Sequence, residues 1–382
     1  MLRRRSLAAL LLLVLAAIPG SALADEGLTL PPSGDNPQAS VTQAIGPVRV
    51  TIDYSSPRVV RGKNDRRGHI WGELVPYGMA DVGGNNCTSC PWRAGANENT
   101  TFTVTHDVLV QGQKLPAGTY GVHMIPGKEE WTVIFSKDSD SWGSYFYTPK
   151  DDALRVTTKS AKSPYNEWLT YEFIEREPAK ATVALRWEEL QVPVTITVPN
   201  VNDLWVASIR EEMRGSAGFH SENWQQAAQW CADNDVNLPE ALTWAQRAVS
   251  DPTWSGGDEN FVTLTTLATL QKKNGQAAEA QKTLAKAYNH PSATPVQIHQ
   301  AARALQREGE KAEAIKLYQL NAKRFPNQWP VHVGLMRAYA ASGDNKKALA
   351  EAKLALAQAP DEQNKKNLEG LVQKLEKGES IE

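Results

Sequence analysis

The first half of the chain alternates apolar and polar residues, and this pattern is typical of β-strands. Apolar side chains occupy every second position in several separate runs between Val48 and Val198. An alternation with period two places one face of a strand on a core and the other in water. Turn signals rich in Gly and Pro separate the runs, so the sequence predicts an antiparallel β-sandwich or barrel over residues 38–199. The runs are Val48–Tyr54, Trp131–Phe135, Leu169–Phe173, Val183–Trp187 and Val192–Val198.

After Asn200 the spacing becomes helical, and a repeat is visible. Gly275, Gly309 and Gly343 are separated by 34 residues each time. Five residues after each glycine stands an alanine, and a proline follows near the end of each unit. The alanines are Ala280, Ala314 and Ala348, and the prolines are Pro291, Pro326 and Pro360.

This pattern resembles the tetratricopeptide-repeat family, in which paired antiparallel helices recur every 34 residues. Glycine suits the turn between the helices, alanine allows their close approach, and proline ends the second helix. We predict a linker with a helix over 200–234 and a repeat domain over 235–382 with three full units. The units are 261–294, 295–328 and 329–362, preceded by a degenerate copy at Leu238–Pro252 and followed by a capping helix at Asp361–Lys377.

An array of this kind forms a curved surface with a groove. We expect the groove to hold a protein or peptide partner. The alternatives are that the array only supports the β domain or forms a dimer.

The N-terminus predicts export. Arg3, Arg4 and Arg5 precede an apolar run, Leu7–Ile18, and small residues end the segment at Ala24. This three-part order is typical of a cleaved signal peptide, here 1–24, so we expect a periplasmic or secreted protein whose mature chain starts near Asp25. The apolar run is too short to span a membrane, and no later stretch is long enough.

Charge and motifs exclude several classes of function. The formal net charge of −2 provides no electrostatic basis for binding nucleic acid. The sequence contains no nucleophile elbow, phosphate loop or HExxH motif. We therefore expect no cofactor and no bound metal.

Seven ordered motifs cover most of the predicted β domain. Together they resemble the secreted bacterial domain-of-unknown-function 2911 family. The resemblance implies an exported all-β domain, sometimes followed by tetratricopeptide repeats, and implies no established activity. This chain departs from the family pattern at Met79–Pro91, a segment inserted between two motifs. The motifs are SPRVVRG (Ser56–Gly62), IWGELVPYG (Ile70–Gly78), WRAGANENTTF (Trp92–Phe102), LPAGTYGVHMIPG (Leu115–Gly127), EWTVIFSK (Glu130–Lys137), SWGSYFY (Ser141–Tyr147) and DALRV (Asp152–Val156).

The inserted segment contains Cys87 and Cys90. In an exported chain, two cysteines this close favour a local disulfide that stiffens the loop. A redox-active pair is an alternative, although no βαβ pattern surrounds it. A zinc site is another, with His69, His106 or His123 completing the ligands.

A compact polar block, Arg93, Asn97 and Glu98, follows the cysteines. Guanidinium and carboxylate groups in one place can bind an anionic or hydroxyl-rich ligand, or can pair internally and pin two loops. The other ligand-binding candidates are Arg58, His69, Tyr77 and Trp92.

These features predict an exported, non-catalytic binding or scaffold protein. The repeats would engage a protein partner, and the β domain a small ligand or an envelope surface. One alternative is an envelope hydrolase that uses Glu98 with His69 or Glu73 as an acid–base pair. The other is a redox or metal-handling protein that acts through Cys87 and Cys90.

Overall fold

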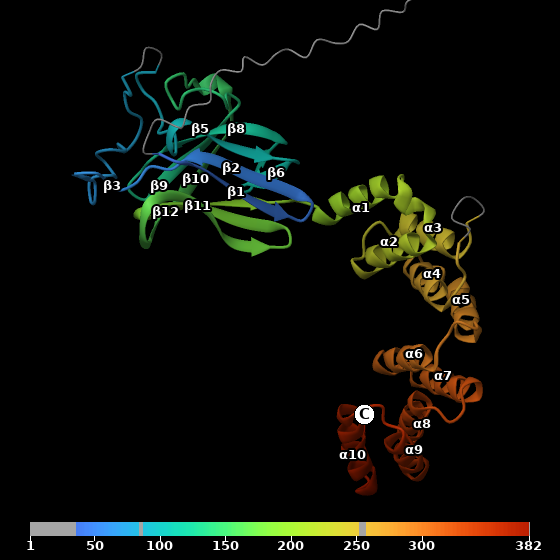
Figure 1. The fold of residues 1–382 in the computed structure, drawn as a ribbon. Helices are drawn as coiled ribbons and strands as arrows, with labels where there is room; N and C mark the ends of the chain where they lie inside the picture. The colour runs from blue at the N-terminus through green and yellow to red at the C-terminus, as the bar shows by residue number, and fades with distance from the viewer. Residues whose placement is uncertain (1–35, 84–86, 252–256, 382) are drawn as a thin grey trace, which may run out of the picture. The chain divides into compact units, whose positions relative to one another are not determined.

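The computed structural model describes residues 36–83, 87–251 and 257–381 (Figure 1). Contacts divide the chain into two compact units, Met1–Pro199 and Asn200–Glu382. We call them the β domain and the helical domain. The expected signal peptide, 1–24, lies outside the described residues. No helix in the described ranges is long and apolar enough to cross a bilayer.

The β domain consists of two main antiparallel sheets and a small hairpin. The larger sheet contains, in spatial order, β1 (Gln38–Ile45), β2 (Val48–Ser55), β5 (Ala96–Val104), β8 (Gly118–Ile125), β9 (Glu130–Ser136) and β10 (Asp152–Lys159). The smaller sheet contains, in spatial order, β11 (Ala161–Glu177), β12 (Lys180–Thr197), β6 (Val108–Val110) and β7 (Gln113–Leu115). The hairpin pairs β3 (Val60–Arg61) with β4 (Asn64–Asp65), and a short helical turn spans Pro149–Asp151.

The two sheets face each other across an aromatic core. Tyr54 on β2 contacts Tyr171 on β11, with ring centroids 5.0 Å apart. All residues of the five alternating runs that point inward in the predicted pattern are buried. In the described residues the two sheets share no hydrogen-bonded strand pair. The predicted fold class is therefore confirmed, as a sandwich-like arrangement and not a closed barrel.

The hairpin of β11 and β12 is much longer than the short strands that the sequence predicts. The alternation explains its shape, because apolar positions are odd-numbered up to Trp187 and even-numbered from Val192. Between them, Glu188 adopts a left-handed conformation with φ of +55°. Irregularities in the pairing of β11 lie opposite this point. The bulge bends the hairpin, and both halves keep their apolar face on the core.

The helical domain is a series of antiparallel helix pairs (Figure 1). Helices α4, α6 and α8 begin at residues 261, 295 and 329, the first residues of the three predicted units. The helices are α1 (Val201–Glu212), α2 (Ser221–Asp233), α3 (Leu238–Val249), α4 (Phe261–Lys273), α5 (Ala277–Asn289), α6 (Pro295–Arg307), α7 (Lys311–Arg324), α8 (Trp329–Ala341), α9 (Asn345–Ala357) and α10 (Glu362–Glu376), with a short turn at Ser216–Phe219 between α1 and α2.

The three repeat glycines end the first helix of each pair in the same way. Gly275, Gly309 and Gly343 have φ between +79° and +88°, which L side chains rarely adopt. The next residue donates its N–H to a carbonyl five positions back, as Glu310 does to Leu305 over 2.9 Å. This hydrogen-bond pattern is a Schellman motif. The turn predicted from the 34-residue spacing of the glycines is therefore present in the structure.

The repeat alanines lie where paired helices meet. Ala280, Ala314 and Ala348 are at most 3% exposed. A larger side chain at these positions would push the helices of a pair apart. The last pair is covered by α10, through Leu368, Val372 and Leu375.

Candidate functional site

The β domain contains a pocket of about 320 Å³, which we call the Trp92 pocket. Three of the motifs that carry the family resemblance meet there, SPRVVRG, IWGELVPYG and WRAGANENTTF, and the inserted segment forms part of its wall. The described lining residues are Asn36, Pro57, Arg61, Arg66, Leu74, Val75, Pro76, Gly78, Ala80, Val82, Cys90, Pro91, Trp92, Arg93, Gly95, Ala96 and Trp187.

Two rings of a tryptophan cluster, Trp92 and Trp187, form the floor of the Trp92 pocket. The rings of Trp92 and Trp187 are nearly parallel, at 12°, with centroids 6.4 Å apart. Trp71 packs edge-on against both rings, and Trp131 packs against Trp71 and Trp92. Such a cluster fixes ring positions tightly because aromatic pairs favour defined geometries.

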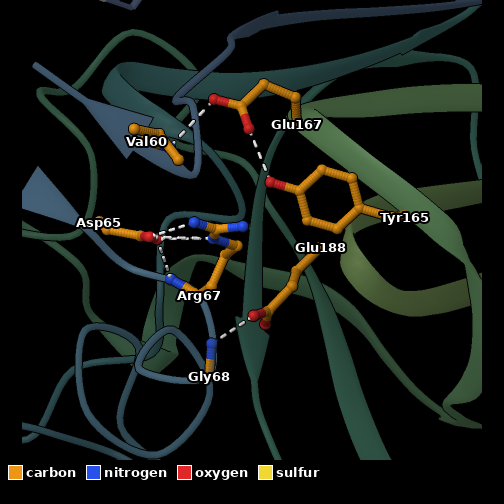
Figure 2. Close-up of polar contacts among 7 residues, drawn as sticks. All are labelled: Val60, Asp65, Arg67, Gly68, Tyr165, Glu167 and Glu188. Carbon is orange, nitrogen blue, oxygen red and sulfur yellow. Dashed lines mark hydrogen bonds and ion pairs between the residues drawn. The ribbon is translucent and has the colours of Figure 1, made fainter.

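The loop that contributes Arg61 and Arg66 is fastened to the bent hairpin (Figure 2). Glu167 accepts hydrogen bonds from the Val60 N–H (3.0 Å) and the Tyr165 hydroxyl (2.7 Å). Glu188, at the bulge, accepts from the Gly68 N–H over 2.5 Å. The Tyr165 hydrogen bond, together with the Val60 N–H, lowers the pKa of Glu167, which remains ionised and holds the loop.

Arg93 reaches the pocket from the short segment before β5. Its guanidinium donates to the Asn97 carbonyl over 2.5 Å and lies 5.0 Å from the centre of the Tyr145 ring. The backbone of Gly143 lies directly against this guanidinium and leaves no space for a side chain there. The WRAGANE and SWGSYFY motifs therefore hold one arginine in a fixed position.

Cys87 and Cys90 are joined by a disulfide, with the sulfur atoms 2.10 Å apart. Both are nearly fully buried. Ala80 and Cys90 exchange two backbone hydrogen bonds of 2.8 and 2.9 Å. The bridge therefore closes the inserted segment at the point where Cys90 lines the pocket. Among the described residues no three His, Cys, Asp or Glu side chains are grouped as metal ligands.

Other predicted ligand-binding residues lie outside the pocket lining. Arg58 stacks on Trp168 at 5.1 Å, and its Nε is 3.5 Å from a Glu167 oxygen, which is the internal pairing considered from the sequence. Tyr77 is 42% exposed and covers Gly72. The side chain of Asn97 accepts a hydrogen bond from Asn36 (3.1 Å).

The acidic candidates do not gather at the Trp92 pocket. Glu98 is exposed, accepts a hydrogen bond from Ser55 (3.1 Å), and lines a different, open pocket with Asp53. His69 and Glu73 form an exposed pair with atoms 3.0 Å apart, each side chain 65% exposed. Neither His69 nor Glu73 lines the pocket that contains Glu98.

One of the pockets of the helical domain has a volume of about 190 Å³ and lies between α6 and α8. Its described lining includes cations and no carboxylate, so we call it the arginine cleft. Arg303 and Arg307 lie one turn apart on α6, and Arg337 faces them from α8. The lining residues are Arg303, Gln306, Arg307, Lys311 and Arg337.

The arginine cleft has an uncompensated positive charge at Arg337. Burial, and then the neighbouring Arg303, lower the pKa of Arg337. The buried Nε of Arg337 has no hydrogen-bond partner in the described part of the chain. Burial, reinforced by Arg337 and Arg303, also lowers the pKa of His299 beside them to about 4. An oxyanion in the cleft would supply the missing acceptor and the missing negative charge.

Sequence reasoning missed the residues that complete both sites. Trp187 was correctly predicted to point into the core, but the sequence does not bring it to Trp92, which is 95 positions away. The arginine cleft did leave a signal. Arg303 and Arg337 have no acid three or four positions away, whereas exposed Lys282 pairs with Glu279. Arg303 on α6 and Arg337 on α8, each without a nearby acid in sequence, mark this cleft.

Solved structures of tetratricopeptide-repeat proteins resemble the helical part. A crystal structure of YrrB, described as a tetratricopeptide-repeat protein with an unusual peptide-binding site, is 19% identical and has a TM-score of 0.29; the match covers 44% of this chain and 85% of that one. A repeat protein from Parabacteroides merdae is 16% identical, with a TM-score of 0.31 and coverage of 43% and 62%. PilF of Pseudomonas aeruginosa is 14% identical, with a TM-score of 0.28 and coverage of 45% and 74%. At such scores these likenesses say nothing about what this chain binds.

The β domain has a clearer relationship. Comparison with curated proteins finds no match. Residues 36–196 match the family described as "Protein of unknown function (DUF2911)". This match confirms the resemblance predicted from the seven motifs. The match to this family model ends at residue 196, and a series of helix pairs follows it in the chain.

Proposed function

We propose that this protein is an exported, non-catalytic binding or scaffold protein. Its helical domain holds a protein partner through an acidic segment, and its β domain holds a small ligand. The single observation that carries the proposal is the arginine cleft, where Arg303, Arg307 and Arg337 converge without a carboxylate among the described lining residues. Clustered guanidinium groups are suited to carboxylates because each presents several N–H donors in a planar fork.

The positions of the acidic residues support binding over hydrolysis. An acid–base pair needs two titrating groups that face one reacting atom. Glu98 and the His69–Glu73 pair line no common pocket among those described above. The His69 ring instead lies against Glu73 on the surface, with its Nδ1 3.0 Å from a carboxylate oxygen.

Export is part of the proposal and has its own test. The N-terminal order of arginines, apolar run and small residues predicts cleavage before Asp25. N-terminal sequencing of the protein from a periplasmic or culture fraction should find a chain that starts near Asp25. A full-length chain retained in the cytoplasm would contradict the exported role.

Partner binding can be tested on the mature full chain with a labelled probe peptide. We compare a peptide rich in glutamate with the same peptide carrying glutamine, using fluorescence anisotropy. The glutamate peptide should bind, and added salt should weaken binding because exposed charge pairs are screened. R303Q and R307Q should each weaken it by about tenfold, the scale of one charge-assisted hydrogen bond.

R214Q provides the matched control. Arg214 is 74% exposed, pairs with Glu211, and does not line the cleft. Its substitution should leave peptide affinity unchanged. Equal binding of both peptides, or loss of affinity that is the same in R214Q as in R303Q, would contradict an acidic partner at the arginine cleft.

A further inference from the structure

The chemistry of the Trp92 pocket narrows the ligand of the β domain. Its walls combine an apolar surface with hydrogen-bond donors. Val75, Pro91 and Cys90 belong to the apolar part, together with the nearly parallel rings of Trp92 and Trp187. A volume of about 320 Å³ is at the lower end for small-molecule sites. The ligand is therefore small, and a planar apolar body can pack against the partly exposed ring of Trp92.

Three groups at the pocket are donors whose capacity is not used up. The side chain of Arg66 is partly buried and makes no hydrogen bond or ion pair with the described residues. Arg93 uses one nitrogen on the Asn97 carbonyl and retains further N–H groups. Trp187 is only 2% exposed, and its indole N–H has no acceptor in the described chain.

The two guanidinium groups retain unused N–H donors, so a ligand that supplies acceptors to them is favoured. The described lining contains no aspartate or glutamate. A ligand that brings acceptor oxygens can bond the unused donors of Arg66 and Arg93, and two guanidinium groups favour a negative charge on these oxygens.

We propose that the Trp92 pocket binds a small organic anion, in which an oxyanion of the carboxylate type is attached to a planar apolar body. The oxyanion lies at Arg66 and Arg93, and the apolar body lies against Trp92 and Trp187. This inference deepens the small-ligand part of the proposed function and is independent of the protein partner at the arginine cleft.

The test uses an isosteric pair of probes, naphthoate and the neutral naphthamide, with the mature full chain. Calorimetry gives each affinity, and the NMR signal of the Trp187 indole N–H reports where the probe binds. Naphthoate should bind about tenfold more tightly than naphthamide, the scale of one charge-assisted hydrogen bond. Both probes should shift the Trp187 indole signal.

R66M should remove most of the preference for naphthoate and leave naphthamide affinity within twofold. Since Arg66 makes no described side-chain contact with a polar partner, the fold should tolerate the change, and unfolding curves check this. R66K should recover part of the preference because it restores the charge without the planar fork. R176M is the control, because Arg176 is exposed on β11 and outside the pocket lining.

The outcomes separate two failures. Equal affinity for the two probes, or an unchanged preference in R66M, would overturn the anionic ligand. No Trp187 shift with either probe would overturn the pocket as a ligand site. Neither result would bear on the proposed protein partner, because binding of the glutamate peptide tests the helical domain separately.

Discussion

The Trp92 pocket and the arginine cleft are built in opposite ways. The pocket joins residues from Asn36 to Trp187, and its floor depends on rings from segments far apart in sequence. The cleft joins residues from Arg303 to Arg337, which belong to neighbouring helix pairs. In the β domain the geometry of a site depends on packing between segments that are far apart in sequence. In the helical domain it depends only on the neighbouring helix pairs. A destabilising substitution should therefore affect the whole β domain, but only the neighbouring helix pairs of the helical domain.

The largest expected effect comes from removing one core tryptophan in each domain. W131A deletes a fully buried ring and should cost the β domain about 3–5 kcal/mol of unfolding free energy. W224A in α2 should loosen α2 and α3, where Trp224 packs near Trp244, without affecting α8 to α10. Hydrogen exchange measures both. Uniform loss of protection throughout the helical domain in W224A would contradict local stability.

Acid should weaken both domains, each through one histidine whose pKa is lowered by desolvation. Burial lowers the pKa of His123 to about 4, with Asp138 opposing and Arg93 adding to the effect. The pKa of His299 is likewise lowered to about 4. The unfolded chain binds the proton first, so stability is complete above pH 6.5 and falls as the pH drops towards 4.

Each histidine should account for about 3 kcal/mol over this interval. H123F should flatten the pH dependence of the β domain alone, and H299F that of the helical domain alone. Urea unfolding at several pH values, followed by hydrogen exchange, measures this. If one substitution removed the pH dependence of stability in both domains, the two domains would not unfold independently.

Removing the disulfide should have a smaller effect on stability than on ligand binding. The bridge closes a ring of only a few residues, so the chain-entropy model gives it about 2 kcal/mol at most. The double variant C87S with C90S should lower the stability of the β domain within that limit. It should also weaken naphthoate binding, because Cys90 lines the Trp92 pocket. Unchanged affinity would mean that the inserted segment does not shape the site.

The smallest effects test the repeat turns. G309A forces a side chain into a left-handed position with φ of +88°, and should destabilise the helical domain by about 1 kcal/mol. G370A lies within α10 with open space around it, and should stabilise by a similar amount. Thermal unfolding measures both signs. A stabilising G309A would contradict the turn that the glycine period predicts.

The sequence predicted the helical domain well because its contacts are local. Gly275, Gly309 and Gly343 each define a turn by their own conformation, so their spacing reveals the pairing of helices without any long-range information. The alanine positions follow from the same period. The β domain was predicted as strands and as a family, but the length of β11 and β12 was not, because a bulge at Glu188 joins runs that look separate.

The candidate sites were only partly predictable. The motif places Trp92 and Arg93 together and both line the Trp92 pocket, whereas Arg58 is paired with Glu167 and stacked on Trp168. Side-chain pairing of this kind depends on where β11 passes the loop, which no spacing in sequence encodes. Local sequence patterns indicate which residues could bind a ligand. Tertiary packing determines which of these residues keep hydrogen-bond donors that no protein group uses.

The most direct test of the central claim is a titration of the mature chain with naphthoate and the glutamate peptide, in either order, with mass spectrometry of both ligands afterwards. We expect one site for each ligand, and binding of one ligand should leave the affinity for the other unchanged. R66M should impair naphthoate binding alone, and R303Q should impair peptide binding alone. Both ligands should be recovered chemically unchanged. Failure of both ligands to bind, or recovery of a cleaved peptide that a catalytically inert chain would not produce, would contradict it.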